Sequence, residues 1–136
     1  MSDPSLELQA AIVTKLKANA GVKAVVGDPA RVYDEVPPGP TFPYISIGDS
    51  QVLPDKADCI DGTEIFFSID GWARDKSIPM VKKISKAVVA ALDDQDLTVS
   101  GYSVIVFELN TVNYLRDPDG LTRHVALNFR ALIQLA

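Results

Sequence analysis

The sequence YSVIVFELNTVNYLRDPDGLTRHVALNFRALIQL, residues 102–135, predicts a long β-hairpin around which the rest of the chain can be arranged. Tyr102–Leu115 is expected to form one arm and Leu121–Leu135 the other. The Asp-Pro-Asp-Gly sequence at 117–120 is a strong turn signal between them. In the second arm apolar and polar residues alternate, so one face of that strand is apolar. The apolar positions are Val125, Leu127, Phe129, Ala131 and Ile133, and the polar ones are His124, Asn128, Arg130 and Gln134.

The first arm differs from the second because apolar residues occupy both sets of alternating positions. One set contains Ile105, Phe107 and Leu109, and the other contains Val104, Val106 and Val112. A sheet that helices cover on one side needs only one apolar face. We therefore expect part of the second face, or an edge of the sheet, to contact another subunit. The candidate residues for this subunit interface are Val104, Val106, Val112, His124 and Arg130.

Two amphipathic segments predict helices. The first helix is expected from about Pro4 to Ala20, with Asp3 as its N-cap and Gly21 as its stop. The second is expected from about Ser77 to Asp93, and residues 21–29 are expected to form a helical turn or a loop. Apolar residues recur at helical spacing in both segments and give each helix one face to bury. In the first helix they are Leu6, Leu8, Ile12, Val13 and Leu16, and in the second Ile78, Val81, Ile84, Val88, Ala91 and Leu92.

Patterns with a period of two predict the remaining strands. A short strand is expected near residues 31–34, another begins at Tyr44, and a third covers Thr63–Asp70. The main elements then follow the order α, β, β, α, β, β, which predicts a single α+β domain over residues 1–136. We expect a mainly antiparallel β-sheet of four to five strands. Two α-helices would pack on one face of this sheet, and the C-terminal hairpin would supply its last two strands.

The chain is acidic, and the acidic residues are concentrated in one stretch. It contains 13 basic and 18 acidic side chains, for a net charge of −5. This charge argues against a protein that holds DNA by its phosphates. Residues 49–64, which we call the acidic segment, carry five carboxylates against one lysine, Lys56. The segment is either a solvated loop or an acidic surface for repulsion or docking. Its acidic residues are Asp49, Asp55, Asp58, Asp61 and Glu64.

The composition excludes several classes of protein. Apolar residues make up 47% and charged residues 23% of the chain, as in soluble globular domains. The single cysteine, Cys59, excludes an internal disulfide and a cysteine-rich zinc site, and the single histidine, His124, leaves most metal and triad chemistry without its parts. No secretory signal or membrane-spanning run is visible, so we expect a protein kept in a reducing cytosol, without a membrane partner. We find no catalytic, cofactor or metal motif and do not expect an enzyme.

The order of these features resembles the tail-completion (tail-terminator) proteins of long-tailed phages and of phage-derived gene transfer agents. The resemblance covers nearly the whole chain, and its most specific parts are Pro-Tyr-Ile at 43–45 and Asp-Gly-Leu-Thr-Arg-His at 119–124. The matching pieces are the opening helix through Leu16, Val32–Pro37, Pro43–Gly48, Asp70–Trp72, Ile78–Leu92, Tyr114–His124 and Phe129–Ala131.

This resemblance implies a structural protein without catalysis or cofactor. Its α+β protomers would close into a ring, typically a hexamer, at the head-proximal end of the tail tube in the virion, after assembly in the host bacterial cytoplasm. The ring would stop tube polymerisation, bind the tail tube protein and the head–tail connector proteins, and let DNA pass through its lumen without specific binding. On this basis we expect the acidic segment to line or rim the lumen, or to face the next ring.

Two alternatives remain open from the sequence. The first is a head-completion adaptor or stopper between portal and tail, which would also be a small acidic ring protein without an active site. The second is an unrelated α+β enzyme or ligand-binding domain, which would need a deep pocket with convergent polar groups. No residues in the sequence indicate such a pocket.

Overall fold

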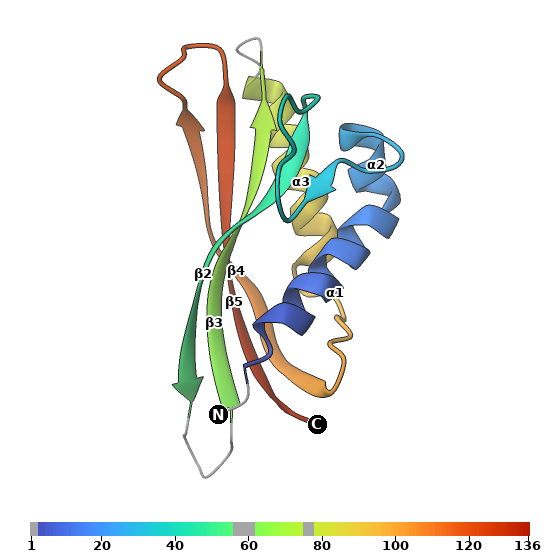
Figure 1. The fold of residues 1–136 in the computed structure, drawn as a ribbon, viewed down its shortest axis with the longest axis vertical. Helices are drawn as coiled ribbons and strands as arrows, with labels where there is room; N and C mark the ends of the chain where they lie inside the picture. The colour runs from blue at the N-terminus through green and yellow to red at the C-terminus, as the bar shows by residue number, and fades with distance from the viewer. Residues whose placement is uncertain (1–2, 56–61, 75–77) are drawn as a thin grey trace.

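The structure, a computed structural model, describes residues 3–55, 62–74 and 78–136. A five-stranded sheet in the order β1-β2-β3-β5-β4 carries helices on one face only (Figure 1). Four strands run antiparallel to their neighbours, and the short β1 (Val32–Tyr33) pairs parallel to β2 (Tyr44–Asp55). The sheet is therefore mixed but mainly antiparallel, and the α+β prediction is confirmed. We call the face without helices the open face.

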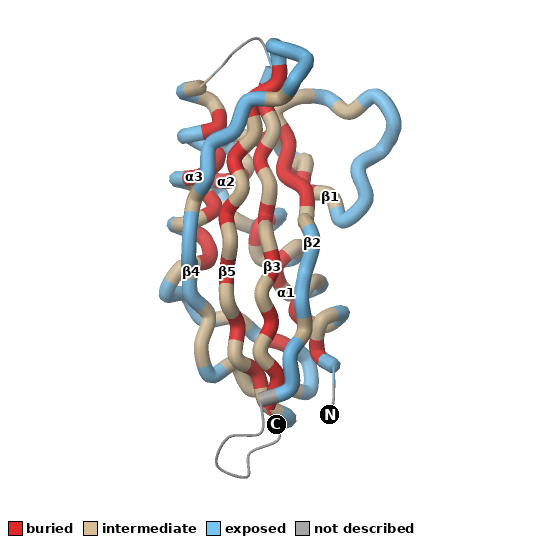
Figure 2. Tube along the Cα trace, turned by 90° about the vertical axis from the view of Figure 1, so that its left-hand side faces the viewer, coloured by how far each residue is buried: buried red, intermediate tan, exposed pale blue. Residues whose placement is uncertain are grey.

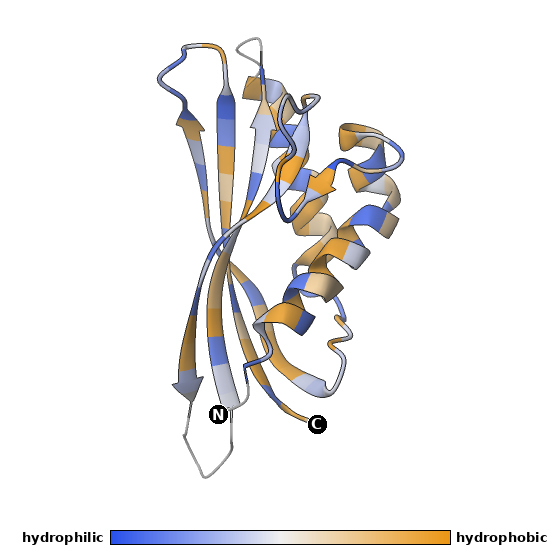
Figure 3. Cartoon of the chain, viewed as in Figure 1, coloured by the Kyte–Doolittle hydropathy of each residue, from blue (hydrophilic) through white to orange (hydrophobic). Residues whose placement is uncertain are grey.

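The predicted C-terminal hairpin is confirmed. β4 (Tyr102–Arg116) pairs antiparallel with β5 (Arg123–Leu135) over almost their full length. β5 lies between β3 (Gly62–Ala73) and β4, and its residues alternate between buried and half-buried (Figure 2). Apolar and polar residues alternate along it in the same way (Figure 3). The apolar set predicted from the sequence is fully buried: Val125, Leu127, Phe129, Ala131 and Ile133.

Two β-bulges in β4 explain why both of its alternating sets are apolar. The register with β5 shifts between Val104 and Val106 and again between Leu109 and Thr111. Each extra residue changes which face the following side chains occupy. Val104 and Val112 lie opposite the buried Ile133 and Leu127, so they share the helix-covered face with Phe107 and Leu109. Of the apolar residues in the two sets, only Val106, opposite Leu132, lies on the open face, and Ile105 falls in the first bulge.

The first helix ends earlier than predicted, and an additional short helix follows it. α1 covers Ser5–Ala18, and α2 covers Ala20–Val26, so the helical turn rather than the loop is found in the region expected from residue 21 onward. Asn19 interrupts the helical path with extended backbone angles, and its side chain accepts a hydrogen bond from the Val22 N–H at 3.0 Å. Asparagine is a strong N-cap, so it begins α2. Gly21 as the stop of the first helix was therefore wrong.

The strands β2 and β3 extend into the acidic segment. Asp49 and Asp55 belong to β2 and Glu64 belongs to β3, so a solvated loop over residues 49–64 was wrong for these three positions. Strand residues project to alternate faces at fixed intervals, which gives the carboxylates of Asp49 and Glu64 defined positions. Asp58 and Asp61 lie outside the described residues.

The core lies between the sheet and the helices. α3 (Ile78–Leu92) buries its predicted stripe except Ile78, which is half-buried. α1 buries Leu8, Ile12 and Leu16, whereas Leu6 is 74% exposed. At Gly71 a Cβ atom would come within 2.6 Å of the Ile84 side chain, so the missing side chain allows α3 to approach β3 closely. The sheet side of the core is filled by three aromatic rings, Phe67, Phe107 and Phe129, with centroids 5.5–5.9 Å apart.

Candidate functional site

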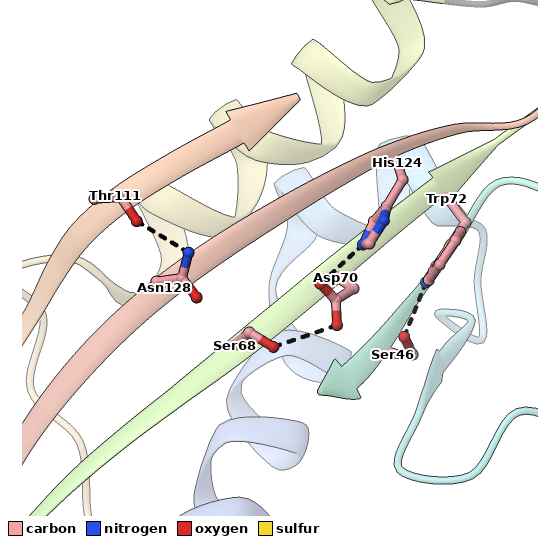
Figure 4. Close-up of polar contacts among 7 residues, drawn as sticks. All are labelled: Ser46, Ser68, Asp70, Trp72, Thr111, His124 and Asn128. Carbon is pink, nitrogen blue, oxygen red and sulfur yellow. Dashed lines mark hydrogen bonds and ion pairs between the residues drawn. The ribbon is translucent and has the colours of Figure 1, made fainter. Parts of the chain in front are cut away.

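The upper part of the open face carries an ordered polar cluster (Figure 4). His124 on β5 stacks on Trp72 of β3, with ring centroids 3.8 Å apart and planes 10° from parallel. The His124 Nε2 atom lies 2.9 Å from Asp70 Oδ1, and Trp72 Nε1 donates to Ser46 Oγ at 2.9 Å. Ser68 Oγ donates to the other Asp70 oxygen at 3.4 Å. These contacts join three strands, so side chains on this face are held in fixed orientations.

An ion-pair triad crosses the open face further along the strands. Arg130 on β5 donates from Nε to Glu64 on β3 at 2.6 Å and from Nη1 to Glu108 on β4 at 3.2 Å. The hydrogen bond to Glu64 is the main reason that the Arg130 pKa is raised. Arg130 is therefore shared between two carboxylates, and the triad keeps a net charge of −1. Beside the triad, Asn128 Nδ2 donates to Thr111 Oγ1 at 2.9 Å.

The structure separates the residues of the acidic segment. Glu64 is in the triad on the open face, and Asp49 is exposed beside an irregularity of β2 between Ile47 and Ser50. Asp55 lies near the end of β2, opposite Gly62. Glu64 shares its arginine with Glu108, so the triad as a whole still carries one negative charge.

The candidate interface residues fall on both faces of the sheet. Val106, His124 and Arg130 lie on the open face, whereas Val104 and Val112 pack against the core on the helix-covered face. The sequence analysis did not assign Asp70, Trp72 and Glu108 to a site. A signal was available in β3, because Glu64, Ser68, Asp70 and Trp72 occupy alternate positions and therefore share one face. The polar residues of β5 alternate in the same way, which indicates that the two strands present a common polar face.

The outer edge of β4 is partly blocked against pairing with another strand. The two bulges interrupt its regular spacing, and the Leu109 N–H donates to Asp93 Oδ1 at 3.2 Å instead of remaining free. Bulges and occupied backbone groups are common means of protecting sheet edges. A contact through the open face is therefore favoured over extension of the sheet at β4.

The turn between β4 and β5 forms a rigid tip. Asp119 accepts hydrogen bonds from the N–H groups of Leu121 and Thr122 at 2.9 and 2.8 Å, and from the Thr122 hydroxyl at 2.6 Å. The Thr122 side chain contributes most to lowering the Asp119 pKa, to about 2. Two backbone hydrogen bonds, from Asp117 to Thr122 and from Gly120 to Asp117, complete the turn.

Metal-binding groups and acid–base pairs among the described residues bear on possible chemistry. Within them, no group of three or more histidine, cysteine, aspartate or glutamate side chains could hold a metal ion. His124 and Asp70 form a pair, and the serine of the same network, Ser68, donates to Asp70. None of the described helices is long and apolar enough to cross a membrane.

One family model matches most of the chain, and two solved structures are similar to it. The model of the family described as Tail completion protein gp17 matches residues 10–134. A chain in the virion of a native gene transfer agent (GTA) particle is 29% identical, with a TM-score of 0.89 over 98% of this chain and 99% of that chain. Bacteriophage SPP1 gp17 protein is 23% identical, with a TM-score of 0.64 over 93% and 88%, which shows the same fold. A search of curated proteins gave no match.

Proposed function

The chain belongs to the tail completion protein gp17 family, and we propose that it forms a ring at the head-proximal end of the tail tube. In this role it is a structural component of a phage or gene transfer agent virion. The ring ends polymerisation of the tube and provides the surface that joins the tail to the DNA-filled head. Its partners are further copies of the chain, typically six in all, together with the tail tube protein and the head–tail connector proteins.

The observation that carries this proposal is the match to a chain of the gene transfer agent virion. The two chains are similar over 98% and 99% of their lengths with a TM-score of 0.89, so the similarity extends to the whole domain. A protein that works by contact needs ordered surfaces and no reaction centre. The open face and the hairpin tip meet that need, because hydrogen bonds and stacked rings fix their side chains.

A closed ring requires contacts between two different patches on neighbouring protomers. We propose that the open face supplies one patch, through Val106, His124 and Arg130. Val104 and Val112 support it from the helix-covered face, where they hold β4 against the core. The blocked edge of β4 favours packing of this face over strand addition.

We further propose that the acidic segment lines or rims the channel, or faces the next ring. A lumen through which DNA slides is favoured by repulsion of phosphate, and the net charge of −5 supports this. Four aspartates of the segment, Asp49, Asp55, Asp58 and Asp61, supply most of the repulsive charge, because Glu64 shares Arg130 with Glu108. A ring structure with these four aspartates on the outer wall, away from every partner, would exclude this role.

Addition of the purified protein to polymerising tail tube protein tests the proposed function. The protein should stop elongation at a substoichiometric ratio to tube subunits, since only the tube end is bound. Electron microscopy should show a ring at one end of each tube. A protein that leaves tube growth unchanged but retains DNA in filled heads would instead be a head-completion stopper.

A further inference from the structure

A groove beside α1 has features of an incomplete binding site. It has a volume of about 500 Å³ and lies between α1 and residues 96–100. Its apolar lining comes from Leu6, Ala10, Ala11, Ala18 and Leu97. Leu6 is 74% exposed, although apolar residues of this size gain most from burial.

One residue of the groove lining, Glu7, has a carboxylate oxygen that lacks a partner. Glu7 Oε2 is buried and accepts no hydrogen bond in the part of the chain that the structure describes. The lysine in the groove lining, Lys15, donates to the backbone carbonyl of Asp96 and not to Glu7. An unsatisfied buried acceptor is costly, so the groove favours a ligand that brings a cationic donor together with apolar side chains.

The hairpin tip carries both a cationic donor and exposed apolar side chains. Leu121 is 49% exposed and Leu115 is 47% exposed, and Arg116 between them in the chain is exposed with no ion pair among the described residues. The hydrogen bonds of Asp119 hold the turn in one shape before any contact forms. A preorganised segment loses less conformational entropy when it binds.

We propose that the hairpin tip of one protomer docks in the α1 groove of a second copy. Leu121 enters the apolar lining, and the guanidinium of Arg116 donates to the half-buried Glu7 carboxylate. The tip lies at the top of the sheet in Figure 1, whereas residues 96–100, which line the groove together with α1, lie low on the helix-covered side, so tip and groove are apart within one chain. A second copy is favoured because its groove offers a carboxylate for an unpaired arginine and an apolar lining for exposed leucines.

This contact joins two different patches, so it is heterologous and can be repeated around a ring. It rests on the proposed function in one respect, namely that the protein works as an oligomer. It adds a second contact between neighbouring protomers to the one proposed through the open face, and it is independent of which face lines the lumen.

A charge exchange between the two patches tests the proposal. Arg116→Glu and Glu7→Arg should each raise the concentration needed for self-association at least tenfold, and the double variant should restore it to within about threefold of the original. Lys83→Glu on the exposed side of α3 is the matched control, with the same change of charge as Arg116→Glu and no expected effect. Thermal denaturation should show that all four variants fold.

Cross-linking between two labelled proteins gives a second, independent readout. In a Cys59→Ser background, one protein carries Leu121→Cys and the other Ala10→Cys. A short bis-maleimide should join the two proteins in a mixture, both in solution and in tails assembled with the tube protein. The same reagent should not join a mixture of Leu121→Cys with Lys83→Cys.

The outcomes separate the docking proposal from the function. Tube capping with no cross-link, or folded single variants that are not rescued by the double variant, would overturn the docking contact and leave the function standing. Rescue and cross-linking without tube capping would support the contact and contradict the function. Absence of self-association, both alone and with the tube protein, would overturn the docking contact.

Discussion

The two β-bulges in β4 make Val106 and Val112 respond differently to the same substitution. Val112 lies opposite the fully buried Leu127 and packs against the core, whereas Val106 lies opposite Leu132 on the open face. The two valines are six residues apart, so a regular strand would place them on one face. Substitution by aspartate should therefore affect mainly folding at Val112 and mainly assembly at Val106.

The structure sets the expected size of each effect. Full burial of a valine contributes about 1.5–3 kcal/mol, so the half-buried Val112 contributes about 1 kcal/mol. Desolvation of a polar group beside the core adds about 1–3 kcal/mol. Val112→Asp should therefore lower the free energy of unfolding by about 2–4 kcal/mol. Val106→Asp should lower it by no more than about 1 kcal/mol, because its side chain lies on the open face.

Two assays measure these effects side by side. Urea and thermal denaturation give the stability of each variant, and a chain of this length loses roughly 3–5 °C of Tm per kcal/mol. Light scattering, under conditions in which the original protein forms rings, gives the assembly state. Val106→Asp should remain folded as a monomer, and Val106→Thr, which keeps the shape without a charge, should still assemble. Equal stabilities for the two aspartate variants would refute the placement of the bulges, and normal rings of Val106→Asp would refute the interface.

Three further variants probe the core and the tip. Phe129→Ala removes a ring that is stacked on Phe67 and should lower the free energy of unfolding in urea by about 3–5 kcal/mol; a loss below 1 kcal/mol would contradict its central place in the core. Gly71→Ala places a Cβ atom 2.6 Å from the side chain of Ile84 and should cost about 1–3 kcal/mol by thermal denaturation, whereas unchanged stability would mean that α3 can move away freely. The lowered pKa of Asp119 stabilises the fold fully above about pH 4, and this contribution is lost as the pH falls towards 2. Asp119→Ala should therefore lower stability at pH 6 and show a smaller decrease between pH 4 and 2 than the original protein, and identical acid profiles would refute the role of this carboxylate.

The parts of the fold that follow from local patterns were predictable. The hairpin followed from alternation in β5 and from the turn residues at 117–120, and α3 followed from its apolar spacing. The break at Asn19 was missed because Gly21 was taken as the helix stop, although asparagine is the stronger signal for a new helix.

The bulges could not be predicted from periodicity. An extra residue is detectable only when the pairing with the neighbouring strand is known, and without it two apolar sets indicate two apolar faces. This is why Val104 and Val112 were expected beside Val106. The pairing of Glu64 with Arg130 was hidden for the same reason, because 66 residues separate them in the chain.

Electron microscopy of tails assembled with and without the protein tests the central proposal most directly. With the protein, tails should have one length, and each should end at its head-proximal side in a ring into which the structure fits. Without it, tubes should grow to uncontrolled lengths and fail to join heads. Tails of normal length that lack only DNA retention in the head, or a ring at any other site, would contradict the proposal that this protein ends the tail tube.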